Sequence, residues 1–278
     1  MAKKKTKKTK SKFQWRTAET SDRHELYEKS VQEPHAECEL IDQVWKEQRG
    51  RKCQSIREDF CGTAVVCGEW VKRRKKNTAV GVDLDAEVLD WGRKRVQKRL
   101  NSDQRRRMRL IEDSVLTVRT EPVDSVLAMN FSYYIFQHRD ELRGYFQRAR
   151  EALVEDGLLL IDAYGGSDSF LEMEEERDLD GFTYIWDQHH YNPITGQAVN
   201  HIHFRFPDST EMRKAFTYKW RLWTLPEIRE LLREAGFRKV VVYWEGTDEE
   251  TEEGNGEWAV STRGEACPGW VAYLVGIK

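Results

Sequence analysis

Apolar residues in the first half of the chain form short continuous runs, and these runs alternate with stretches that have helical spacing. The runs at 79–83, 108–111, 123–129 and 158–161 predict buried strands. Between them, Val88, Leu89, Val96 and Leu100 share one side of a helix, and a second amphipathic helix covers 140–153. Alternating strands and helices predict an α/β fold with a largely parallel sheet.

The pattern changes to period-two alternation between residues 181 and 224. Turn-forming residues at 192–196 and 207–209 divide this part, so it predicts three antiparallel strands. Aromatic side chains are dense along these strands. A capping box at Thr224 and Glu227 then begins a helix over 225–235. Strands are expected at 239–244 and 270–275, with an acidic, solvated loop between them at 245–268.

Two helices are expected before the first strand, over 22–30 and 37–48. The lysine-rich start, residues 1–12, has almost no apolar side chain and predicts a disordered tail. Such a tail suits either a solvated terminus or an arm that binds nucleic acid. The acidic run at 245–257 and the lack of a basic motif elsewhere favour the solvated terminus.

Composition limits the classes of protein that the chain can belong to. It has 278 residues, of which 39% are hydrophobic and 34% charged, and it has no apolar run long enough for a membrane span. No signal peptide is visible. The five cysteines show no C-x-x-C pair, which is typical of a reducing compartment. These features predict a soluble, cytoplasmic protein without a membrane partner, and they leave its oligomeric state open.

The stretch from 55 to 85 is the main candidate for a ligand site. It reads as a strand, a turn of small residues, a helix and a second strand that ends at Asp83. Such a turn directs backbone N–H groups at a ligand, and an acid at the next strand end suits the two hydroxyls of a ribose. A dinucleotide site would need G-x-G-x-x-G, of which only Gly62 is present.

The same stretch resembles the first two motifs of class I S-adenosylmethionine-dependent methyltransferases. Glu58 matches the acid of the first motif and 61–63 match its C-G-T core, while Phe60 and Ala64 stand where that family has glycine. Residues 81–85, Gly-Val-Asp-Leu-Asp, match the second motif, G-V-D-L-S. The resemblance implies that Asp83 binds the ribose and that Leu84 packs on the adenine.

Later segments extend this resemblance. Glu112-Asp113-Ser114 resembles the motif whose acid accepts from the adenine amino group, and 130–134 lie where the family lines the gap between methyl donor and acceptor. A tyrosine on an N-terminal helix folds over the cofactor in many members, a role that Tyr27 would take here. The resemblance therefore assigns S-adenosylmethionine as cofactor, held by Tyr27, Glu58, Phe60, Cys61, Gly62, Thr63, Asp83, Leu84, Asp113, Ser114, Asn130 and Ser132.

The catalytic residues are harder to predict. Methyl transfer needs alignment more than acid–base chemistry when the acceptor is a neutral amine, whereas a hydroxyl acceptor usually needs a base. Tyr133 and Tyr134 are candidates to face the acceptor, and His138 is a candidate base. His201 and His203 stand two apart on one strand, as zinc ligands do, but no further ligand flanks them at a recognisable spacing. No metal is therefore expected.

Together these observations predict a seven-stranded Rossmann-like methyltransferase sheet with an N-terminal helical cap and an antiparallel β insertion. The expected parts are a tail (1–20), the cap (21–50), the cofactor-binding core (51–165), the insertion (166–224) and the end of the sheet (225–278). The expected activity is methyl transfer to nitrogen or oxygen of a small molecule. Alternatives are a nucleic-acid or protein methyltransferase, disfavoured because no base-flipping motif is present, a non-catalytic cofactor-binding protein and, more weakly, a dehydrogenase.

Overall fold

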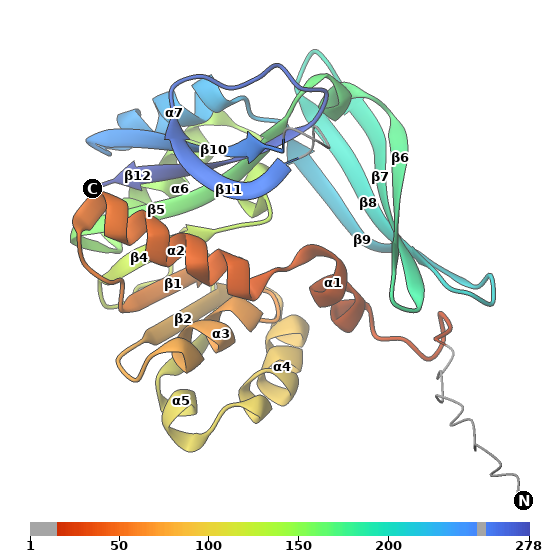
Figure 1. Ribbon diagram of the computed structural model, residues 1–278, viewed down its shortest axis with the longest axis horizontal. Coiled ribbons are helices and arrows are strands. Elements are labelled where there is room, and N and C mark those ends of the chain that lie inside the picture. The colour runs from red at the N-terminus through yellow and green to blue at the C-terminus, as the bar shows by residue number, and fades with distance from the viewer. Residues whose placement is uncertain (1–15, 249–253) are drawn as a thin grey trace, which may run out of the picture.

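The computed structural model describes residues 16–248 and 254–278 (Figure 1). The lysine-rich stretch at 1–12 lies outside the described residues, so the expectation of a disordered tail stays a prediction. Within the described residues, no helix has both the length and the apolar character that crossing a membrane requires.

The larger sheet is built around parallel strands that the apolar runs predicted. Its strand order is β11-β10-β12-β5-β4-β1-β2-β3. The five strands β1 to β5 are parallel to one another, and β12 pairs antiparallel with β5 and with β10. The strands are β1 (Ser55–Asp59), β2 (Thr78–Asp83), β3 (Met108–Glu112), β4 (Val123–Ala128), β5 (Leu153–Gly165), β10 (Lys239–Thr247), β11 (Gly254–Ser261) and β12 (Trp270–Ile277).

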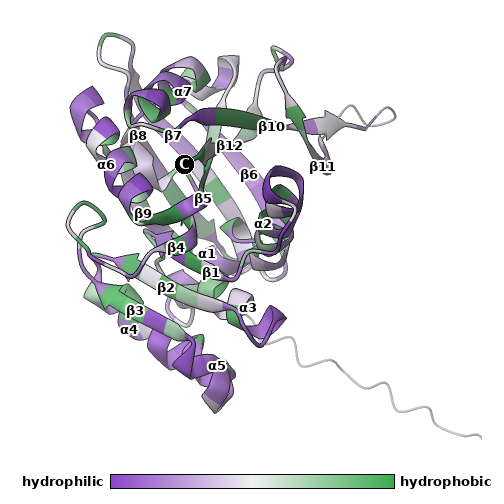
Figure 2. Ribbon diagram, turned by 90° about the vertical axis from the view of Figure 1, so that its left-hand side faces the viewer, coloured by the Kyte–Doolittle hydropathy of each residue, from purple (hydrophilic) through white to green (hydrophobic). Residues whose placement is uncertain are grey.

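Helices cover the larger sheet on both faces, and each face has its own apolar core. One core joins α2 and α3 to the sheet through side chains such as Trp45 and Trp70, and the other joins α6 and α7 through Phe146 and Leu231. In Figure 2 the outlying α5 is mostly hydrophilic, whereas the first half of β10 is largely hydrophobic. The helices are α1 (Arg23–Val31), α2 (Pro34–Arg49), α3 (Val65–Arg73), α4 (Ala86–Arg95), α5 (Ser102–Arg106), α6 (Arg139–Glu151) and α7 (Leu225–Glu234).

A second, antiparallel sheet is inserted between β5 and α7 and stands beside the larger sheet, with α1 near its β9 edge (Figure 1). Its order is β6-β7-β8-β9, formed by β6 (Met173–Leu179), β7 (Phe182–Asn192), β8 (Gln197–Arg205) and β9 (Glu211–Arg221). A third core, which includes Leu26, Phe204 and Ala215, packs α1 against this sheet.

Within residues 16–248 and 254–278, each sheet has one strand more than the sequence pattern predicted. The eighth strand of the larger sheet, β11, comes from the segment that we expected to be a solvated loop. In the insertion, β6 reads Met-Glu-Glu-Glu-Arg-Asp-Leu and has no apolar alternation. Both are edge strands, which need little burial, and the charges of β6 also protect it from further pairing.

Candidate functional site

The loop after β1 has a backbone shape that usually requires glycine. Phe60, Gly62 and Ala64 all have positive φ, at 58°, 51° and 58°. Phe60 and Ala64 are the two positions at which the sequence departs from the G-x-G pattern. Phe60 and Ala64 therefore adopt the left-handed conformation although each has a Cβ atom, which costs about 1–2 kcal/mol of backbone strain for each residue.

Asp83 joins this loop to the end of β2. Its Oδ2 accepts from the Gly62 N–H at 2.8 Å, and its Oδ1 accepts from the Asp85 N–H at 2.9 Å. Asp85 in turn caps α4 by accepting from two backbone N–H groups. The carboxylate therefore lies at the open carboxyl end of the sheet and in contact with the loop.

Two glycines allow this close packing. A Cβ on Gly92 of α4 would lie 2.5 Å from the Thr63 carbonyl oxygen, and one on Gly81 of β2 would lie 2.8 Å from the Cys61 sulfur. Because the Gly92 contact is with backbone, a side chain there would push the loop itself. Gly81, from the second motif, is thus needed for contact with the first.

Glu58 provides a buried acid beneath the loop. Its side chain accepts from the Cys67 N–H at 3.1 Å, and burial raises the pKa of Glu58 to about 7. Next to it, Asp59 forms a buried ion pair with Arg57, at 2.8 Å, and accepts from the Tyr145 hydroxyl. Both acids line the cleft, but Asp59 is paired with Arg57, whereas Glu58 has no cationic partner among the described residues.

The end of β4 contributes a second strained turn. Asn130 and Phe131 both have φ of 57°. The Asp162 carboxylate on β5 accepts from both backbone N–H groups, at 2.7 and 2.8 Å, and so holds the turn. Burial raises the pKa of Asp162 to about 7, while these two hydrogen bonds oppose the rise.

Helix α1 closes the site from the N-terminal side. Asp22 caps the helix, and its Oδ2 accepts from the Trp91 indole on α4 at 2.9 Å, so the cap also attaches α1 to the larger domain. Arg23, His24 and Tyr27 then face the cleft. An N-terminal helix therefore lies beside the cleft, where the helical cap was expected.

These parts enclose a cleft of about 540 Å³. This size is in the range of small-molecule and cofactor sites. Its lining combines carboxylates with the apolar side chains of Val88, Met129 and Ile135, and β9 contributes Lys214 and its neighbours. Of the twelve predicted cofactor residues, nine line it: Tyr27, Glu58, Phe60, Cys61, Gly62, Thr63, Asp83, Asn130 and Ser132.

The other three predicted cofactor residues, Leu84, Asp113 and Ser114, lie outside this lining. Leu84 is 69% exposed. The Asp113 side chain accepts from Ser114 N–H and from the Thr117 hydroxyl, while its backbone N–H donates to the Asp83 carbonyl. Asp113 is therefore a neighbour of Asp83 at the sheet edge, and the adenine contact assigned to it stays a prediction.

A second cavity, of about 230 Å³, adjoins the cleft and has mostly aromatic walls. It shares Tyr27, Asn130, Tyr218 and Trp220 with the cleft. Trp186 and Tyr218 lie 6.0 Å apart between ring centroids, and Tyr218 and Trp220 lie 4.6 Å apart. The further lining includes Tyr164, Tyr184 and, as its one charged residue among those described, Glu175.

The aromatic cavity keeps polar groups as well. The Trp220 indole nitrogen is buried and has no hydrogen-bond partner among the described residues. Burial raises the pKa values of Tyr27, Tyr164 and Tyr218, so their hydroxyls stay protonated at neutral pH. The cavity therefore offers hydrogen-bond donors and aromatic faces.

The structure does not bring the three candidate catalytic residues, Tyr133, Tyr134 and His138, to either cavity. Tyr133 and Tyr134 are fully buried, and their hydroxyls donate to the carbonyl oxygens of Asp162 and Trp223. They lie in the 3-10 helix η2 (Ser132–Ile135), which turns both rings into the core. His138 is the N-cap of α6 and lines neither cavity.

Some residues at the site could not be found from motif position. The sequence did contain a sign of Asp162, which is the single charged residue in the apolar run 158–163. A buried acid in such a run needs a hydrogen-bond partner. Arg23, His24 and Glu175 had none, because their place depends on how α1 and β6 pack.

Comparison with solved structures shows the fold. No protein-family profile matches the chain, and no curated protein matches it in sequence. An S-adenosylmethionine-dependent methyltransferase from Clostridium acetobutylicum superposes with a TM-score of 0.65 at 16% identity, covering 91% of this chain and 96% of that one. The chain thus has the fold of S-adenosylmethionine-dependent methyltransferases.

Two further structures of similar fold carry more specific descriptions. A sugar N-methyltransferase from a Streptoalloteichus species has a TM-score of 0.61 at 15% identity, covering 100% of this chain and 98% of that one. An amino pentose methyltransferase from Micromonospora echinaspora, with S-adenosylmethionine bound, has a TM-score of 0.63 at 14% identity and covers 91% and 95%.

Proposed function

We propose that the protein transfers a methyl group from S-adenosylmethionine to a nitrogen atom of a small-molecule amine. The observation that supports this most directly is the junction of the two cavities. A cleft with carboxylates at strand ends opens, past Tyr27, Asn130, Tyr218 and Trp220, into an aromatic cavity. A methyl donor and an acceptor need such neighbouring sites.

The residues of the cleft fit the donor. Asp83 lies where a ribose would offer hydroxyls, and Val88 and Met129 give apolar surface for an adenine. Glu58 suits the ammonium of the amino-acid end, and Arg23 suits its carboxylate. The bound cofactor supplies a methyl group on a positively charged sulfur, which leaves with the electron pair of the broken C–S bond as a C–N bond forms.

The aromatic cavity favours an amine over a hydroxyl acceptor. Aromatic faces attract cationic groups, and the Glu175 carboxylate adds negative charge at the same wall. Among the described residues that line this cavity there is no histidine, and its tyrosine hydroxyls stay protonated. The one carboxylate of this lining, Glu175, is exposed and is a weak base for a hydroxyl, whereas a neutral amine attacks with its own lone pair and the product ammonium then gives its proton to water.

Two neighbouring cavities would also align the reactants. Alignment of two reactants supplies several kcal/mol of a barrier without a catalytic acid or base. Asn130 and Trp220 are the residues at the junction that are best placed to orient the amine, since both line the two cavities and the Trp220 N–H has no other partner among the described residues.

Turnover with methyl-labelled S-adenosylmethionine tests the proposal. Purified protein is incubated with matched pairs of primary or secondary amines and the corresponding alcohols, and the products are analysed by mass spectrometry. We expect label on amines and none on alcohols. Transfer to alcohols alone would contradict the nitrogen assignment, and cofactor binding with no transfer to compounds of a cell extract would favour a non-catalytic binding protein.

A further inference from the structure

A cluster of metal-ligating side chains lies on the other face of the small sheet, away from the aromatic cavity. Successive residues of a strand point to opposite faces. Trp186 and Ile202 line the aromatic cavity, so Asp187 and His201, their neighbours in sequence, point away from it. The two residues are paired across β7 and β8, and spacing along the chain gives no sign of this pairing.

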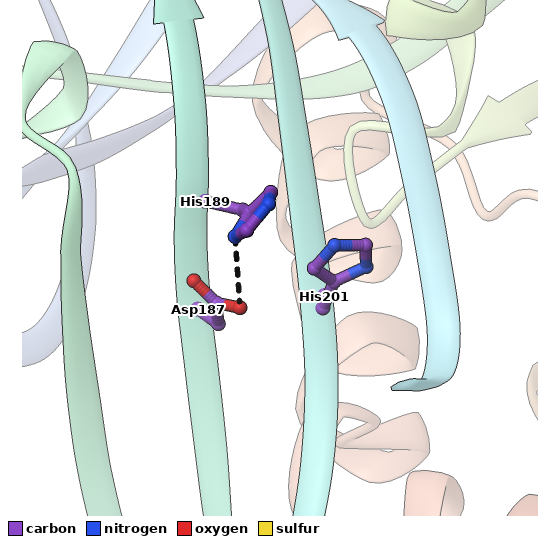
Figure 3. Close-up of side chains that lie close together, drawn as sticks. All are labelled: Asp187, His189 and His201. Carbon is purple, nitrogen blue, oxygen red and sulfur yellow. Dashed lines mark ion pairs between the residues drawn. The ribbon is translucent and has the colours of Figure 1, made fainter. Parts of the chain in front are cut away.

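His189 joins them because β7 is irregular at this point. The register between β7 and β8 shifts between Gln188 and His190, so the extra residue is His189. Its Nδ1 lies 3.7 Å from Asp187 Oδ2, and its ring centroid lies 4.9 Å from that of His201. Figure 3 shows the three side chains gathered over the two strands.

The geometry suits a metal ion. One ligand atom from each of the three residues lies within 4.8 Å of the others. Bonds of about 2.0–2.2 Å from Zn²⁺ to nitrogen and oxygen place two ligand atoms of a tetrahedral site roughly 3.3–3.6 Å apart, so small side-chain movements would complete the site.

His201 provides an independent sign of a missing ligand. It is 4% exposed, and its Nε2 is buried without any hydrogen-bond partner among the described residues. Its other nitrogen, Nδ1, is 2.9 Å from the Thr217 hydroxyl. A buried imidazole with one nitrogen held and the other unpartnered is arranged like a metal ligand with its outer partner.

His203 supports the carboxylate of the cluster. Its Nδ1 accepts from the Lys214 backbone N–H at 2.7 Å, so its Nε2 carries the proton and donates to Asp187 Oδ2 at 3.1 Å. A ligating carboxylate held by such a donor is typical of metal sites. Glu174 lies near Asp187 and His203 and adds negative charge, while Lys214 adds positive charge near His201.

We propose that Asp187, His189 and His201 bind a divalent transition-metal ion, Zn²⁺ in the first place, with water as the fourth ligand. Two imidazoles and one carboxylate suit zinc better than magnesium or calcium, which prefer oxygen.

Such an ion would link β7 to β8, the strands whose opposite face carries Trp186 and Ile202. The three proposed ligands lie outside both cavities, although the outer partner Thr217 also lines the cleft, and metal binding does not depend on methyl transfer. Its role would be to hold the aromatic wall in place. The proposal can therefore fail or succeed independently of the proposed function.

Cobalt titration of untagged protein, stripped of metal by chelator, tests the site. Co²⁺ in a four-coordinate site gives strong visible bands, and their position distinguishes nitrogen and oxygen ligands from cysteine. We expect saturation at one ion per chain and displacement by Zn²⁺. Absence of saturable binding would overturn the proposal.

The chain provides a closely matched pair of variants. His189 and His190 are adjacent and both largely exposed, but His190 pairs with Glu172 at 2.8 Å and lies outside the cluster. We expect His189→Gln to weaken metal binding by at least tenfold, because loss of only the outer partner of a ligand already weakens binding by about that factor. We expect His190→Gln to leave metal binding unchanged. Equal effects of the two variants would contradict the site.

Thr217→Val tests the outer partner, and it keeps the shape of the side chain. We expect roughly 10- to 100-fold weaker binding, because His201 loses the contact that orients its ring. Thermal unfolding with and without Zn²⁺ provides a second readout. Wild type and His190→Gln should be stabilised by Zn²⁺ and His189→Gln should not; stabilisation of all three would contradict the proposal.

Discussion

The two cavities are built in different ways. The cleft at the end of the larger sheet is held by hydrogen bonds between carboxylates and backbone N–H groups, at Asp83, Glu58 and Asp162. The aromatic cavity is formed by ring packing between β7, β9 and α1. A cofactor that never changes can be held by fixed backbone geometry, whereas side-chain packing is easily altered to suit an acceptor. We therefore expect changes in the two regions to have separable effects.

The largest effect should come from Asp83→Ala. The substitution removes the proposed ribose contact and the carboxylate that holds the Gly62 N–H, two charge-assisted contacts worth about 1.5–3 kcal/mol each. We expect S-adenosylhomocysteine affinity, measured by calorimetry, to fall about 100-fold or more. Asp90→Ala, an exposed carboxylate on α4, is the control and should have no effect.

Asp162→Ala should reduce stability as well as binding. The turn at Asn130 and Phe131 would lose both acceptors of its N–H groups. We expect a loss of about 2–3 kcal/mol in the free energy of unfolding, measured with denaturant. Asp162→Asn keeps one acceptor and should lose less; equal losses in the two variants would show that the hydrogen bonds are not the cause.

Trp186→Leu should separate the two regions. Trp186 lines the aromatic cavity only, so we expect acceptor KM to rise roughly tenfold with cofactor affinity unchanged. Trp258→Leu, a partly buried tryptophan of β11, is the matched control. A parallel fall in cofactor affinity for Trp186→Leu would break the distinction between the regions.

Cofactor affinity should depend on pH through Glu58. Its pKa is raised to about 7, and only the ionised form pairs with an ammonium, so affinity should rise by up to roughly tenfold between pH 6 and pH 8. Without cofactor the sign is opposite: the folded protein keeps a proton that the unfolded chain releases above pH 4.5, so stability falls as pH rises from 4.5 to 7. Glu58→Gln should remove the contribution of Glu58 to both trends, and persistence of the affinity trend would assign it to another group.

The smallest effect is expected for Ala64→Gly. Glycine adopts the positive φ of this position without strain but loses a buried methyl group and gains freedom in the unfolded chain. These terms oppose one another, so the free energy of unfolding should change by less than about 1 kcal/mol. Ala64→Val, which cannot adopt this backbone cheaply, should destabilise clearly; no difference between the variants would argue against the left-handed conformation.

The sequence predicted the strands of the parallel sheet because buried strands are continuously apolar, as at 158–161. It did not predict β6 or β11, because an edge strand has little burial to record in its pattern. The carboxylates at strand ends were predictable from position, since parallel strands end at a common edge. Tyr133 and Tyr134 were not, because one turn of η2 decides whether a ring faces the cleft or the core. The proposed metal ligands, Asp187, His189 and His201, are brought together by the register of β7 and β8 and by one bulge, neither of which can be predicted from a local sequence pattern.

A crystal structure with S-adenosylhomocysteine bound tests the central claim most directly. We predict that the ribose lies at Asp83, that the ammonium lies near Glu58, and that the sulfur faces the aromatic cavity at Trp220. A ligand bound elsewhere, or a sulfur directed away from that cavity, would contradict the proposed methyl transfer.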